Sequence, residues 1–404
     1  MPEKQGLFDG LRVLDCASFI AGPAAATIMS DFGADVIKIE PPGEGDSYRW
    51  LGARPGGPVT DQDFASLLTS RNKRSLALDL KTDAGQAVLR RLVAGSDVFL
   101  TNYPLPVRDR LKLTYEDLRG LNPRLIYAGM SAYGEIGPEA GKTGFDATAY
   151  WARSGLMDLV RVDADSMPAR STAGMGDHPT SLALFGAIVM ALYRREKTGL
   201  GGKVSSSLLA SGLYSNGYML QAVLVGATIP PRQPREIVSN ALAGMYHTLD
   251  KRWLSLAMLA EERQWPVLPG IVGRPELLDD PRFASNATRR ANARALFDIL
   301  DGIFPSRTLA DWRAALDAGG ITFGIVSTTD EAAEDEQAHL IGAIRPFADR
   351  PGMTIDSPII LDGEEKTAPR QAPEVGQHSA EILAEAGYSA DEIDALLAAK
   401  VIAS

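Results

Sequence analysis

The first third of the chain alternates short apolar runs with helical patterns. The runs are apolar on both faces, which is typical of buried parallel strands. Between the first two, GPAAATIMSDFG has Pro23 near its start and Gly33 just past its end, where a helix tolerates each residue. Another helix is predicted at 82–96. This alternation predicts a parallel sheet covered by helices, with strands at 11–18, 34–40, 74–80, 97–103 and 124–133.

The middle of the chain carries the strongest helical signal. Apolar residues form one broad face over 180–197, and basic residues follow near the end, before Gly199. The helix is expected to begin close to residue 179. A second long helix is expected over 205–226, after the short strand-like KVS. The segment 227–239 is rich in proline, which interrupts both the helical and the strand spacing of apolar residues. A linker is therefore predicted there.

A second α/β pattern follows the linker. RWLSLAM and ITFGIVS predict strands, and helices are expected over 288–303 and 308–318. PGMTIDSPIILDGEEK indicates an extended or hairpin region, and two short helices split by Gly387 end the chain. We therefore predict an α/β protein with a large Rossmann-like domain (1–226), a linker (227–239), a small α/β domain (240–330) and a return segment with C-terminal helices joining the large domain (331–404).

Composition narrows the class of protein. Apolar residues make up 45% and charged residues 23% of 404 residues, the balance of a folded globular chain. The net charge of −10 disfavours a general nucleic-acid surface. The N-terminus lacks a secretory pattern, and the longest apolar stretch falls short of the roughly 20 residues that span a membrane. The single cysteine, Cys16, excludes an intramolecular disulfide and a thiol zinc site, so a reducing cytoplasm is expected.

Common cofactor motifs are missing. GPEAGKTG resembles a phosphate loop, but the first glycine of that motif falls on Ile136, so an exposed polar loop fits better. No G-x-G-x-x-G follows the first strand and no G-x-S-x-G occurs. The four histidines are scattered and form no zinc-helix spacing. We expect no metal site and no tightly bound cofactor.

Two features are candidates for chemistry. SRNKRS concentrates Arg71, Lys73 and Arg74 before a strand; it is either a solvated charged turn or the cationic cluster that a polyphosphate ligand needs, with Arg110 a second candidate. Asp177 lies about two residues before the predicted helix, so the spacing alone favours a helix cap. Alternatively Asp177 is a carboxylate nucleophile, which the helix N-terminus would keep ionised.

Several motifs in order then suggest a family. VLDCASFIAGPAAATIMSDFGADVIKIEPPGEGDSYR, NKRSLALDLKTDAGQAVLRRLVAGSDVFLTNY, RLIYAGMSAYGEIGP, GFDATAYWARSGLM and GMGDH together resemble the class III coenzyme A transferases, the family of formyl-CoA:oxalate and carnitine CoA-transferases. The likeness runs from about residue 8 to the end of the chain.

The resemblance implies an interlocked homodimer and a covalent mechanism. It makes Asp177 the nucleophile that takes CoA from an acyl-CoA donor through anhydride and aspartyl-CoA thioester intermediates to a small carboxylic acid. Backbone N–H groups around Gly174 and Gly176 would stabilise the oxyanions. The same correspondence puts Ala21, Arg71, Asn72, Lys73, Asn102, Tyr103 and Arg110 in the CoA site.

Departures from the family pattern concern the acyl group. The expected substrate pocket contains Ile20, Phe145 and Asp146; Ile20 replaces a glutamine of oxalate-using members, and Phe145 replaces a histidine of the related racemases. Ile20 makes oxalate less favoured, and the resemblance of GFDATAYWARSG (144–155) to members that act on bulky aryl or branched acids implies such an acid. Tyr150 and Trp151 are either pocket residues or plain core residues, as aromatics at helical spacing more often are. A CoA-thioester racemase or epimerase and a catalytically silent CoA-binding subunit remain the alternatives.

Overall fold

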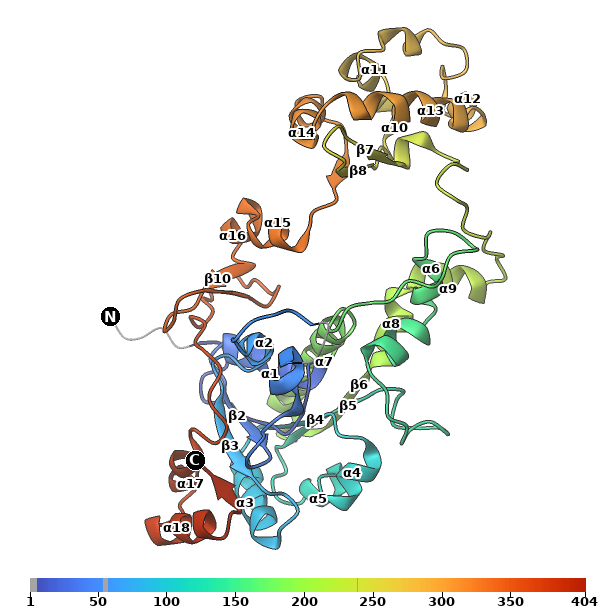
Figure 1. The fold of residues 1–404 in the computed structure, drawn as a ribbon. Helices are drawn as coiled ribbons and strands as arrows, with labels where there is room; N and C mark the ends of the chain where they lie inside the picture. The colour runs from blue at the N-terminus through green and yellow to red at the C-terminus, as the bar shows by residue number, and fades with distance from the viewer. Residues whose placement is uncertain (1–5, 54–56, 238) are drawn as a thin grey trace. The chain divides into compact units, whose positions relative to one another are not determined.

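The computed structural model describes residues 6–53, 57–237 and 239–404 (Figure 1). The chain forms two compact units. Unit 1 contains the residues up to Asp158, Arg170–Thr228 and Gln337–Ser404; unit 2 contains Leu159–Ala169 and Ile229–Glu336. The inclusion of 159–169 in unit 2 has no counterpart in the predicted boundaries.

Unit 1 is built on a seven-stranded sheet in the order β12-β3-β2-β1-β4-β5-β6. All neighbouring strands are parallel except β12, which pairs antiparallel with β3 at the edge. The five predicted strands are confirmed, since each apolar run contains one. The bounds are β1 (Arg12–Asp15), β2 (Asp35–Glu40), β3 (Arg74–Leu78), β4 (Val98–Thr101), β5 (Ile126–Ser131), β6 (Gly202–Ser207) and β12 (Ile402–Ala403).

Helices cover both faces of this sheet, because its strands are apolar on both sides. Leu14, Ile37 and Phe99 point to one face and pack in a single core cluster with residues of α3 and of the C-terminal helices α17 and α18. On the other face α1 and α7 pack against each other and against the strands (Figure 1). The helices of unit 1 are α1 (Ala21–Asp31), α2 (Phe64–Thr69), α3 (Asp83–Ala94), α4 (Leu105–Arg110), α5 (Tyr115–Leu118), α6 (Leu156–Leu159), α7 (Asp177–Thr198), α8 (Leu208–Ser215), α9 (Gly217–Leu224), α16 (Glu336–Leu340), α17 (Ser379–Glu385) and α18 (Ala390–Ala398).

Unit 2 has its own antiparallel sheet and its own core. Strands β7 (Met245–His247), β8 (Trp253–Leu256) and β9 (Phe323–Ile325) pair in that order, and Trp312 and Phe304 lie buried beneath them. Its helices are α10 (Glu261–Gln264), α11 (Leu268–Ile271), α12 (Asn286–Ala291), α13 (Ala293–Ile303), α14 (Leu309–Ala318) and α15 (Thr329–Ala333). The extended or hairpin region expected at 351–366 contains one strand, β11 (Met353–Ile355), which pairs with β10 (Ile344–Pro346) before that region; both strands belong to unit 1.

Two expectations about helices are wrong. The single helix over 205–226 is instead the end of β6 followed by α8 and α9, which break at Asn216. The side-chain amide of Asn216 donates a hydrogen bond to the carbonyl of Ser154 at 2.9 Å, a long-range contact that the local sequence does not show. The helix expected over 288–303 is likewise two helices, α12 and α13, which break at Asn292. The helix expected to begin close to residue 179 is confirmed, with Asp177 as its first residue.

The part of the chain that the structure describes contains no helix long and apolar enough to cross a membrane. It also contains no cluster of three or more His, Cys, Asp or Glu side chains that would hold a metal ion.

Buried ion pairs join the carboxyl ends of the central strands to the loops beside them. Asp15 at the end of β1 pairs with Lys73 at 2.8 Å, and neither side chain is exposed. Lys38 of β2 pairs with Asp46 at 2.7 Å. Because a charge left alone in the interior is costly, these pairs fix the loops that carry them.

The Asp15–Lys73 pair can be tested by removing one or both charges. We expect Lys73→Met to lower the free energy of unfolding by about 3–5 kcal/mol, since it leaves the Asp15 carboxylate buried and unpaired. The double variant Asp15→Asn/Lys73→Met should recover most of that loss, as measured by urea denaturation. Arg119→Met, which breaks an exposed pair with Glu116, is the control and should cost no more than about 1 kcal/mol. A double variant as unstable as the single one would contradict this account.

Candidate active site

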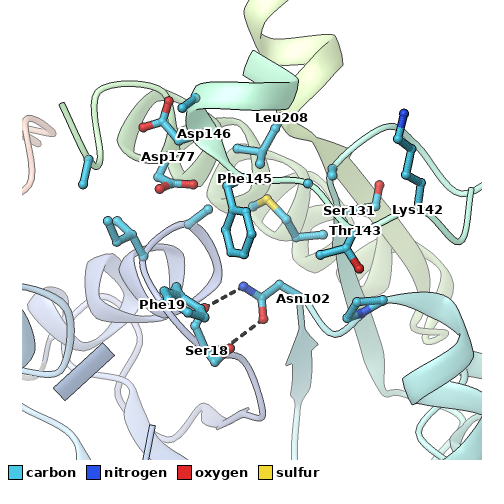
Figure 2. A pocket seen from close by; sticks show the side chains of 18 of the residues that line it. Ser18, Phe19, Asn102, Ser131, Lys142, Thr143, Phe145, Asp146, Asp177 and Leu208 are labelled. Carbon is cyan, nitrogen blue, oxygen red and sulfur yellow. Dashed lines mark hydrogen bonds between the residues drawn. The ribbon is translucent and has the colours of Figure 1, made fainter. Parts of the chain in front are cut away.

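The site forms where the strand order of the large sheet changes direction. β1 and β4 lie side by side, so the loops that leave their carboxyl ends diverge and open a crevice. The side chain of Asn102, just after β4, bridges this crevice: its Oδ1 accepts from the Ser18 N–H at 2.9 Å, and its Nδ2 donates to the Ser18 carbonyl at 2.6 Å (Figure 2). The two loops are therefore held in fixed positions on either side of the crevice.

A cavity of about 620 Å³ occupies the crevice. Loops after β1, β4 and β5 line it, together with the segment before α7. Seven residues that the sequence analysis proposed for the site line this one cavity: Ile20, Ala21, Asn102, Tyr103, Phe145, Asp146 and Asp177.

Asp177 is the first residue of α7, and it is not the cap. Gly176 occupies the N-cap position, and no side chain caps the helix. Within the described residues, the Asp177 carboxylate has no hydrogen bond or ion pair, and it lies beside Asp146 at the cavity (Figure 2). The interpretation of Asp177 as a helix cap is therefore wrong, and its carboxylate is available to a bound molecule.

Gly176 fixes the direction of Asp177. Its N–H donates to Oδ2 of Asp146 at 3.0 Å. A Cβ on Gly176 would lie 2.6 Å from Cδ1 of Tyr150 and 2.8 Å from Oδ1 of Asp146, closer than atoms approach. Because this N–H is already bonded to Asp146, it is not free to donate to an oxyanion, and the expected role of the N–H groups around Gly174 stays a prediction.

Burial raises the pKa of Asp177 to about 7, and the negative charge of Asp146 adds to the rise. The expectation that the helix N-terminus keeps Asp177 ionised is therefore wrong, since desolvation and the neighbouring carboxylate have the larger effect. Burial, followed by the charge of Asp177, also raises the pKa of Tyr48 to about 12. Burial lowers the pKa of His178, and the nearby Arg71 lowers it further.

Asp146 is the first residue of a π-helical turn, Asp146–Ala152, that packs beside the site. Oδ1 of Asp146 is buried and has no hydrogen-bond partner in the described part of the chain. Tyr150 and Trp151 of the same turn do not line the cavity: the hydroxyl of Tyr150 bonds to Ser215, and its ring packs against Gly176. These two aromatic residues support the turn, and the prediction that they line the substrate pocket is wrong.

The expected phosphate-binding cations are already occupied. Arg71 pairs with the buried Asp31 at 2.7 Å, and Lys73 donates to Asp15 and to two carbonyl oxygens. Burial lowers the pKa of Lys73 to about 8, with Asp15 opposing that effect. Asn72 takes a left-handed backbone conformation (φ 61°), and its Oδ1 accepts from the Arg370 N–H. Arg110 is exposed and lies outside the 620 Å³ cavity.

A second cavity of about 230 Å³ shares Tyr103 with the first. Two lysines, Lys81 and Lys400, line it, and both are exposed. Neither lysine was singled out from the sequence. Lys400 follows the last helix and lies outside every motif named above. Phe19 and Lys142 of the first cavity were also missed; the GKT loop was noted but was interpreted only as an exposed turn.

Comparison with known proteins identifies the family. The model of CoA-transferase family III matches residues 8–379. The chain belongs to that family. As a member of CoA-transferase family III it is an enzyme of the CoA-transferase type, and the resemblance found in its motifs is confirmed.

Relatives of this family III member cover nearly its whole length. The (R)-2-hydroxy-4-methylpentanoate CoA-transferase of Clostridioides difficile is 30% identical over 98% of this chain and 99% of its own. The acetyl-CoA:oxalate CoA-transferase of Acetobacter aceti is 33% identical over 82% of this chain and 83% of its own. A crystal structure of a CaiB/BaiF family protein from Brucella suis superposes with a TM-score of 0.84 at 29% identity, covering 95% and 100% of the two chains. The α/β fold of the large sheet is therefore that of the family.

Two glycines of α7 and its cap offer a matched test of the packing at Asp177. Gly176→Ala should lower the free energy of unfolding by about 1–3 kcal/mol and reduce CoA transfer, since its Cβ forces Tyr150 and Asp146 apart. Gly186→Ala, inside the same helix with nothing within 4 Å, should be neutral or stabilising by about 1 kcal/mol. Urea denaturation and steady-state rates measure both effects. Equal effects from the two substitutions would contradict the packing argument.

The raised pKa of Asp177 predicts a pH-dependent stability difference. Because the folded pKa of about 7 exceeds the unfolded value, the folded state holds the proton more tightly. The contribution of this proton to stability is complete below about pH 4, the unfolded pKa, and is lost as the pH rises through about 7. Asp177→Asn should therefore match the wild type in acid and become the more stable protein toward pH 8. Urea denaturation across that range tests it, and a difference that does not vary with pH would refute it.

Proposed function

We propose that this enzyme is an acyl-CoA:carboxylate CoA-transferase in which Asp177 is the covalent nucleophile. One observation carries the proposal: Asp177 is an unpaired carboxylate at the cavity, whereas Asp15, Asp31 and Asp46 are each paired with a cation. Asp146 also lines the cavity without a cation, but its Oδ2 accepts the Gly176 N–H, so among the described residues Asp177 is the lining aspartate with no partner at all. A cavity carboxylate without a partner is a candidate for binding a ligand or for reaction.

In the first half of the proposed reaction, an oxygen of the Asp177 carboxylate attacks the carbonyl carbon of the acyl-CoA thioester. The carbon–sulfur bond breaks, CoA leaves as a thiolate, and a mixed anhydride joins the acyl group to Asp177. The thiolate then attacks the carbonyl carbon of Asp177. The donor leaves as a carboxylate, and Asp177 becomes a CoA thioester.

The second half is the same chemistry in reverse with a different acid. The acceptor carboxylate attacks the carbonyl carbon of the aspartyl thioester. The CoA thiolate leaves, and a second anhydride joins the acceptor to Asp177. The thiolate then attacks the acyl carbon of the acceptor, giving the new acyl-CoA and free Asp177. No net oxidation or hydrolysis occurs, provided that water is kept from the anhydride.

The pKa of Asp177 fits a group that must alternate between charged and uncharged forms. As a carboxylate it attacks; as an anhydride or thioester it carries no charge, and burial beside Asp146 favours the uncharged forms. The same surroundings that raise its pKa therefore favour its acylated states. The fraction of Asp177 that is ionised near pH 7 supplies the nucleophile.

CoA is a long molecule, and we place it along the two cavities that have Tyr103 as a common lining residue. We place the acyl end and the thiol in the larger cavity, against Ala21 and Asn102. The phosphates would then lie toward the smaller cavity, where Lys81 and Lys400 are exposed, with Arg110 as a further candidate. The side-chain charges of Arg71 and Lys73 do not support phosphate binding, because carboxylates hold both.

Other parts of the interpretation rest on the family resemblance. They are the homodimer, a small carboxylic acid as the second substrate, and a location in the cytoplasm. CoA enters as a substrate in this scheme, with no tightly bound cofactor. A racemase is disfavoured because Phe145 lines the cavity where those relatives carry a titratable histidine, and a phenyl ring cannot exchange a proton.

Trapping the covalent intermediate tests the proposal. The enzyme is incubated with a panel of acyl-CoA donors and then with hydroxylamine, which converts an aspartyl thioester to a stable hydroxamate. Peptide mass spectrometry should find the hydroxamate on Asp177. Asp177→Ala should lose the tag and reduce CoA exchange by at least about 10³-fold, the scale expected for removal of a covalent nucleophile.

The control is Asp146→Asn, whose amide oxygen still accepts the Gly176 N–H and whose peptide should remain untagged. A hydroxamate on another residue, or full exchange by Asp177→Ala, would overturn the assignment. Loss of an α-deuterium from the acyl-CoA to water would favour the racemase instead.

A further inference from the structure

Two aromatic rings at the cavity have no part in the transfer steps. Phe19 and Phe145 meet edge to face, with ring centroids 5.8 Å apart and planes at 73°. Phe145 is 55% exposed although it is apolar, and it lies between Asp177 and the loop that carries Thr143 (Figure 2). Phe19 also approaches Tyr48, at 6.4 Å between centroids. These rings form an apolar wall beside the carboxylate.

The backbone of Phe19 is strained. Its φ is 62°, a left-handed conformation that a bulky residue rarely adopts and that costs about 1–3 kcal/mol. Glycine adopts this conformation without penalty, so the loop retains a phenylalanine where a glycine would fit better. Strain of this kind persists only where the surroundings fix it, and it marks positions at which the side chain has a function.

The surroundings do fix Phe19 from both sides. Its N–H donates to Oδ1 of Asp46 at 3.2 Å, and the other oxygen of Asp46 pairs with the buried Lys38 at 2.7 Å. The preceding residue, Ser18, is held by both ends of the Asn102 amide. A buried ion pair and an amide bridge therefore hold the ring at the cavity before any ligand arrives.

The surface beside Asp177 is apolar on a second side. Cδ1 of Ile20 lies 3.5 Å from the Cβ position of residue 174, so this side chain covers the turn that leads to the carboxylate. None of these groups can hydrogen-bond a second carboxylate on the acyl chain. Of the two cations on the lining, Lys142 pairs with Glu139 at 2.9 Å, and Arg170 is exposed.

We propose that Phe19 and Phe145 are specificity-determining residues that select an apolar acyl group, aromatic or branched, over a dicarboxylic acid. The proposal rests on the function proposed above. The two rings contact the acyl chain as it joins Asp177. An aromatic or branched chain packs against both rings. A second carboxylate placed against Phe19, Phe145 and Ile20 would lose its water and gain no hydrogen bond from these three side chains.

The test compares acceptor acids at a fixed acyl-CoA donor. The wild type should show a higher kcat/KM for 3-phenylpropanoate and 4-methylpentanoate than for succinate, glutarate and oxalate. Phe145→Ala and Phe19→Gly should each lower the ratio of kcat/KM for 3-phenylpropanoate to that for acetate by roughly 10- to 200-fold, the range expected for lost apolar contact in a pocket. Phe19→Gly loses the ring contacts with Tyr48 and Phe145 but relieves the left-handed strain, so its thermal midpoint should stay near that of the wild type.

Tyr193→Leu is the matched control, since it removes an exposed ring of α7 that does not line the cavity. Its ratio should equal that of the wild type. Wild-type preference for a dicarboxylate, abolished by Arg170→Met, would overturn the proposal and assign selection to that cation. Unchanged ratios in both phenylalanine variants would overturn it as well.

The trapping experiment separates the two levels of failure. A hydroxamate on Asp177 together with ring-independent selectivity overturns only the role of Phe19 and Phe145. No hydroxamate and no exchange with any acid overturns the proposed function, and the specificity proposal falls with it.

Discussion

The contact between Asp146 and the backbone of Gly176 determines the geometry of the site. One carboxylate oxygen accepts the Gly176 N–H at 3.0 Å, and the ring of Tyr150 occupies the space that any larger residue would need. The N-cap position of α7 is therefore occupied by Gly176, which has no side chain to cap the helix. The following carboxylate, Asp177, cannot fold back to cap the helix and instead reaches the cavity. The start of α7, the close packing at Gly176 and the position of the Asp177 carboxylate therefore all depend on the same contact.

The same contact has an electrostatic effect. Asp146 brings a second acid beside Asp177 in a partly desolvated place, so the pKa of Asp177 rises. Other buried carboxylates are treated differently: Asp15 at the end of β1 and Asp46 in the loop after β2 pair with lysines, and Asp31 at the end of α1 pairs with an arginine. Pairing stabilises loops there, whereas the absence of pairing at Asp177 leaves a group whose charge depends on what is bound. The contrast explains why cations that look available in the sequence do not reach the cavity.

Local patterns predicted the parts of the fold that depend on local forces. Continuous apolar runs gave the five parallel strands, and helical periodicity gave α3, α7 and α14. Long-range contacts decided the rest. The break at Asn216 depends on the carbonyl of Ser154, and the inclusion of 159–169 in unit 2 depends on tertiary packing. Neither feature is visible in the residues that surround it.

The site was partly predictable for the same reason. Motif positions identified seven lining residues, among them Asp177 and Asn102. They could not reveal that Lys73 faces Asp15, because the partners come from different strands. They also did not reveal Phe19, because its ring is held at the cavity by a left-handed backbone that Asp46, from a distant part of the chain, helps to fix. Tyr150 was noticed for its aromatic ring, but its ring packs against Gly176.

The edge strand β12 bears on how the molecule is made. Ile402 pairs with Leu78, so the edge strand of the large sheet is synthesised long after its other strands. Helices α17 and α18, which cover one face of that sheet, are also late. Unit 2 has a core of its own and can form while the large sheet still shows an open edge and an uncovered apolar face. Completion of unit 1 is therefore a late step of folding, since β3 and the face under α17 and α18 depend on residues far along the chain.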